Sequence, residues 1–544
     1  MARFSAINGW TAAAVVTAAL TAVPIVAVLS ALFIDGIDLS SHIWRTTMPD
    51  YVGNTALLMA LVAILSTTIG VSVAWLVTAA EFPGRRTVSW LLVLPLSAPA
   101  YIVAYLYTDI LAFSGPVQTT IREVFGVGAG DYWFPQIRSL PGAALMLSFV
   151  LYPYIYLLSR AAFAAQSRSQ FQAARTLGLS PRRAFFRVVL PGARPAIAGG
   201  LALVMMETLA DFGVAEYFAV PTLSTGIFRT WLAMGDRVAA MQLAGVMLVF
   251  VVVLLSFEAF SRRGQVVSSD RLSAAPPPFK LSPMKGGLAL IACLLPIAFG
   301  FVIPAGVLLN YAITEGDGQT LATLASFTQN SVVAASIASL IAVGLALLLV
   351  YANRQLQTKT LGNSVVKSGI RVATLGYALP GTLLAVGLLS PLGAFDQTLT
   401  RFSRNLFGLD HGLLLTGTIA LLVYAMVVRF LTVSYNSVSG GMEKISGSLD
   451  AAARSLGAKP SRVLREIHAP LLRPSLAAGA ALVFIDVMRE LPATLILRPF
   501  NFETLATRVY RLASDERLTE ASTAALIIVA VGLIPVIVLN RVRA

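Results

Sequence analysis

Long apolar runs dominate this chain and limit what it can fold into. Several of them are about 20 residues long, which matches the thickness of a bilayer's hydrocarbon core. With 57% hydrophobic and only 12% charged residues, the chain has too few polar groups to cover the surface of a soluble protein. The runs therefore predict an all-α, polytopic membrane protein.

Twelve apolar spans divide equally between two halves of the chain. In the first half they are expected at 10–34, 55–79, 88–112, 141–159, 195–218 and 238–260. In the second half they are expected at 286–311, 331–351, 372–392, 412–434, 474–497 and 521–540. The predicted domains are a first half at 1–260 (core about 54–260), a linker at 261–285 rich in serine and proline, and a second half at 286–544 (core about 326–541).

The basic residues predict the orientation of the chain. Most of the 40 Lys and Arg fall in one set of loops, which the positive-inside rule places in the cytoplasm together with both termini. The net charge of +14 is therefore attributed to membrane orientation, and no nucleic-acid partner is expected. The loop at 498–520 runs against the rule, because it carries four arginines yet falls outside.

The usage of cysteine, histidine and lysine excludes several chemistries. Cys293 is the single cysteine, so no intrachain disulfide or CxxC site can form. The three histidines fall in different loops, and no stable metal site is expected. No lysine follows a glycine, so the chain lacks the phosphate-binding loop of a P-loop ATPase. We expect no catalytic residue and no cofactor bound by this chain.

An internal duplication is the most informative feature of the sequence. Ala174-Arg175-Thr176-Leu177-Gly178 returns 279 positions later as Ala453-Arg454-Ser455-Leu456-Gly457. The same offset pairs further residues, namely Pro181 with Pro460, Pro191 with Pro470, Arg194-Pro195 with Arg473-Pro474, Thr225 with Thr504 and Arg229 with Arg508. This register needs no gap, so we expect two parallel repeats around a pseudo-twofold axis along the membrane normal.

Each repeat contains a cytoplasmic loop with a helix–turn–helix plan. In the first loop, a helical stretch over 169–177 is expected to stop at Gly178, and Ser180-Pro181 is expected to begin a second helix that ends before Pro191. The second loop repeats the plan with Gly457 and Pro460. A short exposed helix on a fixed turn suits insertion into a partner's groove. The alternative is an amphipathic helix that lies on the bilayer.

The two loops resemble the Glu-Ala-Ala loop of binding-protein-dependent ABC permeases. The matching residues are Gln172-Ala173-Ala174…Gly178…Leu190-Pro191 and Ala451-Ala452-Ala453…Gly457…Ala469-Pro470. The resemblance implies the type I importer permease fold, a periplasmic binding protein and two copies of a separate ATPase subunit that uses ATP. The docking residues that it implies are Gln172, Ala173, Ala174, Arg175, Gly178, Pro181, Ala451, Ala452, Ala453, Arg454, Gly457 and Pro460.

Both loops depart from that family's pattern, because the family glutamate is replaced by Gln172 and by Ala451. Asp450 lies one position before Ala451. An ion-gradient transporter and a membrane-embedded enzyme are the alternatives from other classes. The first has no use for two docking loops, and no HExxH motif, nucleophile elbow or histidine cluster supports the second.

Acidic pairs follow each docking loop inside a span. Glu207 and Asp211 are four residues apart, as are Asp486 and Glu490, so each pair shares one helix face. Ionisable groups are costly in a bilayer and usually mark a pathway, so these acids, with Arg489, are predicted to line the translocation path. The alternative is a structural role, such as an ion pair between Glu490 and Arg489.

The surroundings of these acids resemble the fused permeases of ferric-iron importers. The matching stretches are Glu207-Thr208-Leu209-Ala210-Asp211-Phe212-Gly213, Arg489-Glu490-Leu491-Pro492-Ala493-Thr494 and Asn501-Phe502-Glu503-Thr504-Leu505-Ala506-Thr507-Arg508. The resemblance implies import of Fe³⁺ through a multi-pass protein of the bacterial inner membrane. Hard Fe³⁺ prefers oxygen donors, which agrees with carboxylates. Thiamine, polyamine and phosphonate permeases share this organisation and stay open as alternatives.

Overall fold

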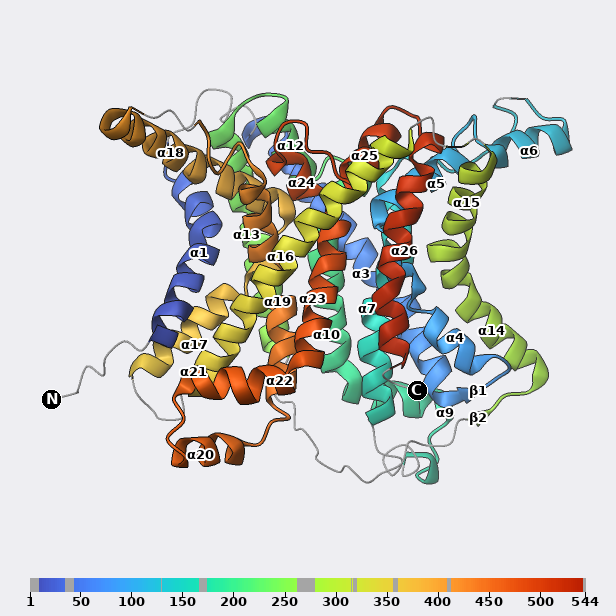
Figure 1. Cartoon of the computed structure of the whole chain (residues 1–544). Helices are drawn as coiled ribbons and strands as arrows, with labels where there is room; N and C mark the ends of the chain where they lie inside the picture. The colour runs from blue at the N-terminus through green and yellow to red at the C-terminus, as the bar shows by residue number, and fades with distance from the viewer. Residues whose placement is uncertain are drawn as a thin grey trace. The chain divides into compact units, whose positions relative to one another are not determined.

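The computed structural model describes residues 9–34, 44–128, 130–165, 174–261, 279–314, 316, 320–355, 361–408 and 412–541, and these are almost entirely helical (Figure 1). Most of the predicted linker lies outside these ranges, as do Gln172 and Ala173.

The elements of the first half are α1 (Gly9–Ala31), α3 (Met48–Ala79), β1 (Ala80–Glu81), α4 (Arg85–Leu91), the 3₁₀ turn η1 (Leu94–Ser97), α5 (Ala100–Leu111), α6 (Pro116–Phe125), α7 (Leu140–Ala165), α9 (Pro181–Ala184), the π-helical turn η2 (Phe185–Val189), α10 (Leu190–Ala210), α11 (Gly213–Tyr217), α12 (Leu223–Leu232) and α13 (Arg237–Ser261). Those of the second half are β2 (Phe279–Lys280), α14 (Pro283–Ile297), the π turn η3 (Ala298–Val302), α15 (Ile303–Thr314), α16 (Leu321–Gln355), α17 (Leu361–Ala373), the 3₁₀ turn η4 (Gly376–Ala378), α18 (Gly381–Phe407), α19 (Ile419–Met442), α20 (Gly447–Ser455), α21 (Pro460–Val463), the π turn η5 (Leu464–His468), α22 (Ala469–Leu471), α23 (Arg473–Met488), α24 (Pro492–Leu497), α25 (Leu505–Ser514), the 3₁₀ turn η6 (Thr519–Ala521) and α26 (Ser522–Arg541).

The helices confirm a polytopic membrane protein, with fewer uninterrupted spans than the twelve predicted. Among the described residues, ten helices are long and apolar enough to cross a membrane, or eleven if the bent pair Pro460–Leu471 and Arg473–Met488 forms one span. The predicted span at 521–540 corresponds to α26, and the apolar helix formed there by η6 and α26 is shorter than a full span, at Thr519–Pro535. The all-α, polytopic class is therefore confirmed, with ten or eleven candidate spans and one shorter apolar helix among the described residues.

Several predicted spans are interrupted, and in two of them the helix restarts directly after Pro99 or Pro380. The span at 88–112 divides into α4, η1 and α5, and Pro99 immediately precedes α5. The span at 372–392 begins in α17, passes through η4 and continues in α18 after Pro380. Because proline disfavours a helical conformation in the residue before it, each helix restarts after a turn. Hydropathy is uniform along these stretches, so it did not indicate where the helices break.

The predicted helix of each docking loop does not stop at its proline. In the first loop, α9, η2 and α10 form one helix through Pro191, with the Leu190 N–H bonded to the Phe185 carbonyl five residues back. In the second loop, the helix passes Pro470, ends at Leu471 and bends by 74° into α23. The prediction was wrong because a π-helical turn changes the hydrogen-bond pattern just before each proline.

The chain forms two compact units that do not follow the two halves of the sequence. Unit 1 comprises Met1–Ser40, Ile227–Leu248 and Thr320–Arg508, and unit 2 comprises Ser41–Gly226, Val249–Gln319 and Val509–Ala544. In unit 1, α16, α19 and α23 pack together, and α1 packs against α16, α17 and α18. In unit 2, α3, α7 and α10 pack together, while α14 packs against α4 and α15 against α5 and α26. The first span of each half therefore completes the helix bundle of the other half.

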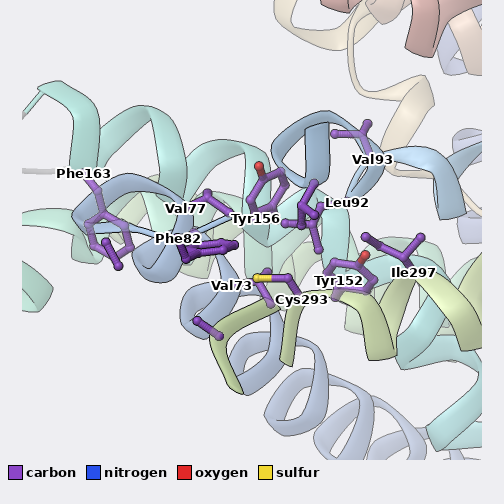
Figure 2. Packing of buried hydrophobic residues seen from close by; sticks show 14 of the residues in the cluster. Val73, Val77, Phe82, Leu92, Val93, Tyr152, Tyr156, Phe163, Cys293 and Ile297 are labelled. Carbon is purple, nitrogen blue, oxygen red and sulfur yellow. The ribbon is translucent and has the colours of Figure 1, made fainter. Parts of the chain in front are cut away.

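In the core of unit 2, side chains of α14, from the second half of the sequence, pack among helices of the first half. Figure 2 shows Cys293 of α14 among residues of α3 and α7, including Val73 and Tyr152, and all three are buried. The Tyr156 hydroxyl donates a 2.6 Å hydrogen bond to the Ser89 carbonyl of α4. The lone cysteine thus serves as a small core residue, which agrees with the apolar run that surrounds it.

Matching hydrogen bonds reveal the true register of the repeat. In unit 2, the Thr222 N–H donates to Thr225 Oγ1 at 2.9 Å, and in unit 1 the Thr504 N–H donates to Thr507 Oγ1 at the same distance. Left-handed backbone occurs just before both turns, at Ala219 and Asn501. Thr222 therefore corresponds to Thr504, 282 positions later. The predicted pairing of Thr225 with Thr504 and of Arg229 with Arg508 is wrong, because three extra residues precede the second turn.

Candidate docking loops and intramembrane acids

Both candidate docking loops, defined here as 174–190 and 447–471, contain the same helix stop. Gly178 has φ +82° and Gly457 has φ +76°, the left-handed conformation that glycine adopts without steric cost. The N–H groups of Gly178 and Gly457 donate to the carbonyls of Arg175 and Arg454, at 3.1 and 3.0 Å. The next N–H in each loop reaches back five residues, which completes a Schellman motif. The predicted backbone shape is confirmed, and the docking role stays a prediction.

A leucine lies directly before the glycine that ends each helix, and sequence reasoning did not assign it a role in docking. Leu177 is 82% exposed and Leu456 is 87% exposed. Ala174 and Ala453, three positions earlier, are buried instead and hold each helix against the protein. The Leu-Gly dipeptide occurs in both repeats, and this repetition could have identified the two leucines from the sequence. An exposed leucine on a fixed turn can fill an apolar pocket of a partner.

Most of the other residues predicted for docking lie where a partner could reach them. Ala451, Ala452, Arg454 and Pro460 are exposed on the second loop, as is Arg175 on the first. Arg175 also donates a 2.7 Å hydrogen bond to the Leu179 carbonyl, which braces its own turn.

Asp450 takes an internal role in the second loop. Its Oδ2 accepts hydrogen bonds from Arg354 Nε at 2.8 Å and Arg354 Nη2 at 2.6 Å, and both side chains are largely buried. Arg354, in the last turn of α16, also donates to the carbonyls of Met442 and Ile445 at 2.9 Å. One arginine thereby ties the end of α19 to the docking helix α20. Sequence reasoning missed Arg354, because its partner lies 96 residues further along the chain.

His468 completes this anchor from the last residue of η5, before the span α23 begins. Its Nε2 lies 2.9 Å from Asp450 Oδ1, and its side chain is fully buried. Burial lowers the pKa of His468 below its ordinary value, although the adjacent carboxylate of Asp450 acts in the opposite direction. The Tyr351 ring packs edge-on against His468, and its hydroxyl donates to the Pro460 carbonyl at 2.6 Å. The second loop is therefore held at both of its helices.

The matched acids Asp211 and Glu490 both cap the short helix that follows their span. Asp211 Oδ1 accepts from the N–H groups of Val214 and Ala215, at 2.9 and 3.2 Å. Glu490 accepts from the N–H groups of Ala493 and Thr494, at 2.9 and 3.0 Å. The two repeats thus use a carboxylate in the same way, to satisfy orphan N–H groups at a helix start.

Ion pairs distinguish the second repeat from the first. Arg429 of α19 lies 3.1 Å from Glu490 Oε1, while Arg489 pairs with Asp486. The suggested pairing of Glu490 with Arg489 is therefore replaced by these two separate pairs. Asp211 has no cationic partner among the described residues. Arg429 was missed, although it is a lone charge within the predicted span at 412–434.

The fold and the paired loops define a two-repeat membrane permease, and comparison with known proteins places it in a family. Residues 66–264 and 362–543 match the family described as binding-protein-dependent transport system inner membrane component. The chain belongs to this family. It is thus a multi-pass inner-membrane component of an importer that works with ATPase and binding-protein partners.

Relatives align along most of the chain. The Fe(3+)-transport system permease protein FbpB 2 of Haemophilus influenzae is 24% identical over 92% of this chain and 91% of its own length. The ferric transport system permease protein FbpB of Actinobacillus pleuropneumoniae is 23% identical over 87% of this chain and 69% of its own length. The molybdenum transport system permease protein ModB of Escherichia coli is 30% identical over only 29% of this chain.

Proposed function

We propose that this chain is the fused permease through which a bacterial importer passes ferric iron. The observation that carries the proposal is the similarity, over about nine-tenths of the chain, to permeases named for Fe(3+) or ferric transport. The similarity to the molybdenum permease covers less than a third of the chain. Carboxylates near the membrane-embedded helix breaks agree with a hard cation as cargo.

Energy comes from a separate ATPase subunit in two copies, one for each docking loop. The chain has no phosphate-binding loop, so ATP is bound and hydrolysed by the partner, and the chain needs no cofactor of its own. The matched Schellman turns with Leu177 and Leu456 support two equivalent contacts. ATPase activity from the purified chain, free of other subunits, would contradict the assignment of ATP hydrolysis to a separate subunit.

The intramembrane acids serve the translocation path in this proposal. A cation that crosses a low-dielectric region needs compensating charge, and Glu207, Asp211, Asp486 and Glu490, together with Arg489, lie at the ends of equivalent spans. These carboxylates act as a transient lining and not as a tight metal site, because a permease must release the cation that it passes. Asp211 is the strongest candidate for substrate contact, because it caps a helix without an arginine partner.

Uptake of radiolabelled ferric iron tests the proposal. A strain that lacks this chain should lose the uptake that a periplasmic iron-binding protein supports, and the intact chain should restore it. The Gly457→Pro variant, produced at the same level in the membrane, serves as the transport-inactive control. Iron uptake that does not depend on the chain would remove iron as the substrate.

A further inference from the structure

Both repeats carry an amphipathic helix at the end of the spans opposite to the docking loop of the same unit. One is α6, and the other is the tail of α18, residues 393–407. In Figure 1, the α18 tail lies across the end of α1 in unit 1, and α6 lies across the end of α15 in unit 2. An offset of 282 residues pairs the members of the two elements, namely Phe113 with Phe395, Val117 with Leu399, Arg122 with Arg404, Val124 with Leu406, Phe125 with Phe407 and Gly126 with Gly408. The two glycines end their helices with φ of +62° and +65°.

In the α18 tail, the side of the helix that faces the protein carries Asp396 and Ser403, while a stripe of apolar side chains is exposed. Phe395, Leu399, Phe402 and Leu406 follow the spacing i, i+4, i+7 and i+11, which places them in one stripe along the helix. Phe395, Phe402 and Leu406 are 54–59% exposed. Asp396, by contrast, is buried and accepts hydrogen bonds from the Thr416 N–H at 2.7 Å and from its hydroxyl at 2.8 Å. The polar contacts therefore fix the helix and leave its apolar stripe uncovered by protein.

In helix α6, too, a polar side chain faces the protein while apolar side chains are exposed. Gln118 is buried and donates to the Leu111 carbonyl at 2.9 Å, and its Oε1 accepts from the Tyr132 hydroxyl at the same distance. Val124 and Phe125 are instead among the most exposed apolar residues of unit 2. These hydrogen bonds hold the side of α6 that carries Gln118 against the protein, while Val124 and Phe125 stay open. The same arrangement in both repeats argues against an accident of one loop.

We propose that α6 and the α18 tail are interfacial helices that bind the headgroup–acyl boundary of the bilayer. The α18 tail continues a buried membrane span without interruption, so its stripe begins where the helix leaves the core of the protein at the end of that span. Arg401 and Arg404 lie on the face of the tail opposite to the stripe, where they can meet lipid phosphates while the phenylalanines enter the acyl region. The ligand is phospholipid, and the two helices brace the ends of the spans against the membrane surface.

Spin labels on full-length protein in nanodiscs of phosphatidylethanolamine and phosphatidylglycerol test this proposal. Cys293 is fully buried, so the protein without an introduced cysteine is the labelling background. Single cysteines replace Phe402, Leu406 and Val124 on the apolar faces, and Gln397 and Glu123 on the polar faces serve as matched controls. Power saturation compares collisions with oxygen, which partitions into lipid, and with a water-soluble nickel chelate.

Labels at Phe402, Leu406 and Val124 should collide more with oxygen than with nickel, and labels at Gln397 and Glu123 should show the reverse. The expected result is that oxygen collisions exceed nickel collisions on the apolar face of each helix and fall below them on its polar face. The three apolar positions lie in two separate helices, so one poorly folded variant does not decide the outcome. Nickel collisions as frequent at Phe402 and Val124 as at the polar controls would place the stripes in water, open to a soluble partner, and would overturn the proposal.

Discussion

Asp450 shows how one side chain can replace a missing family residue without repeating its position. The glutamate of the loop pattern is Ala451 in the second repeat, and the carboxylate one residue earlier contacts Arg354 and His468 of this chain. Its charge therefore holds the docking helix in place from within. The surface of this loop that remains exposed includes Leu456, Ala451, Ala452 and Arg454.

Removal of Arg354 should loosen the second docking loop. Arg354→Ala leaves the buried carboxylate of Asp450 uncompensated, which typically costs about 3–5 kcal/mol. We expect faster amide hydrogen exchange over 447–468 and a lower yield of folded protein. Arg462→Ala is the matched control, because Arg462 pairs with Glu466 on an exposed helix face, where an ion pair contributes about 0–1 kcal/mol. Equal exchange in the two variants would contradict the anchor.

The helix stop at Gly457 should be required for coupling. Gly457→Pro fixes φ near −65° where +76° is needed, and it removes the N–H that bonds to Arg454. We expect the variant to insert in the membrane but to fail to stimulate its ATPase partner. Gly457→Asn is the control, since asparagine tolerates the left-handed region. Normal stimulated hydrolysis in the proline variant would show that the turn plays no part in docking.

At the scale of elements, local sequence signals predicted local geometry well. Gly178 and Gly457 were placed correctly because a C′ glycine depends only on its own backbone. The π-turns before Pro191 and Pro470 were missed, since a proline in a helical pattern more often ends the helix than forces a wider turn. Partners such as Arg429 and Arg354 could not be assigned, because each contact joins helices far apart in the sequence.

The capping acids should respond differently to neutralisation in the two repeats. Asp211→Asn keeps an oxygen for the Val214 and Ala215 N–H groups, so we expect folded protein with slower substrate uptake. Glu490→Gln leaves the buried guanidinium of Arg429 without its carboxylate, so we expect less protein in the membrane. Membrane abundance and uptake are measured together.

The double variant Glu490→Gln with Arg429→Met separates these effects. It removes both charges, so it should recover abundance relative to Glu490→Gln alone. Failure to recover would mean that the pair does not determine the stability of this helix break. Unchanged uptake in well-folded Asp211→Asn would remove Asp211 from the path.

At the scale of the whole molecule, hydropathy located the spans but not their partners. Nothing in an apolar run of α1 or α14 reveals which bundle it completes, because lipid-facing and bundle-facing helices use the same residues. The repeat register also shifted by three residues, since the insertion lies in a loop where no hydrophobic period constrains length. These features arise from long-range packing.

The predicted outside position of the arginines at 498–520 runs against the positive-inside rule. Arg517 forms two hydrogen bonds to Glu520, at 2.7 and 2.6 Å, and Arg498 lies 3.6 Å from Glu503. Arg508 stacks over the Phe327 ring, 5.6 Å from its centroid. Each of these three arginines therefore has a partner close to it in the structure. The outside position of this segment follows from twelve predicted spans with cytoplasmic termini, and it stays a prediction.

Single-cysteine labelling of spheroplasts tests this topology directly. Cysteines at Ser180 and Lys459 mark the two docking loops, and cysteines at Trp133, Asn405 and Ser514 mark the opposite ends of the spans; all five positions are exposed. Because basic loops stay in the cytoplasm, an impermeant maleimide should label only the last three in intact spheroplasts and all five after permeabilisation. Buried Cys293 provides an unlabelled background in both conditions. Labelling of Ser180 and Lys459 in sealed spheroplasts would invert the topology, and failure to label Ser514 alone would move the arginine-rich segment to the cytoplasmic side.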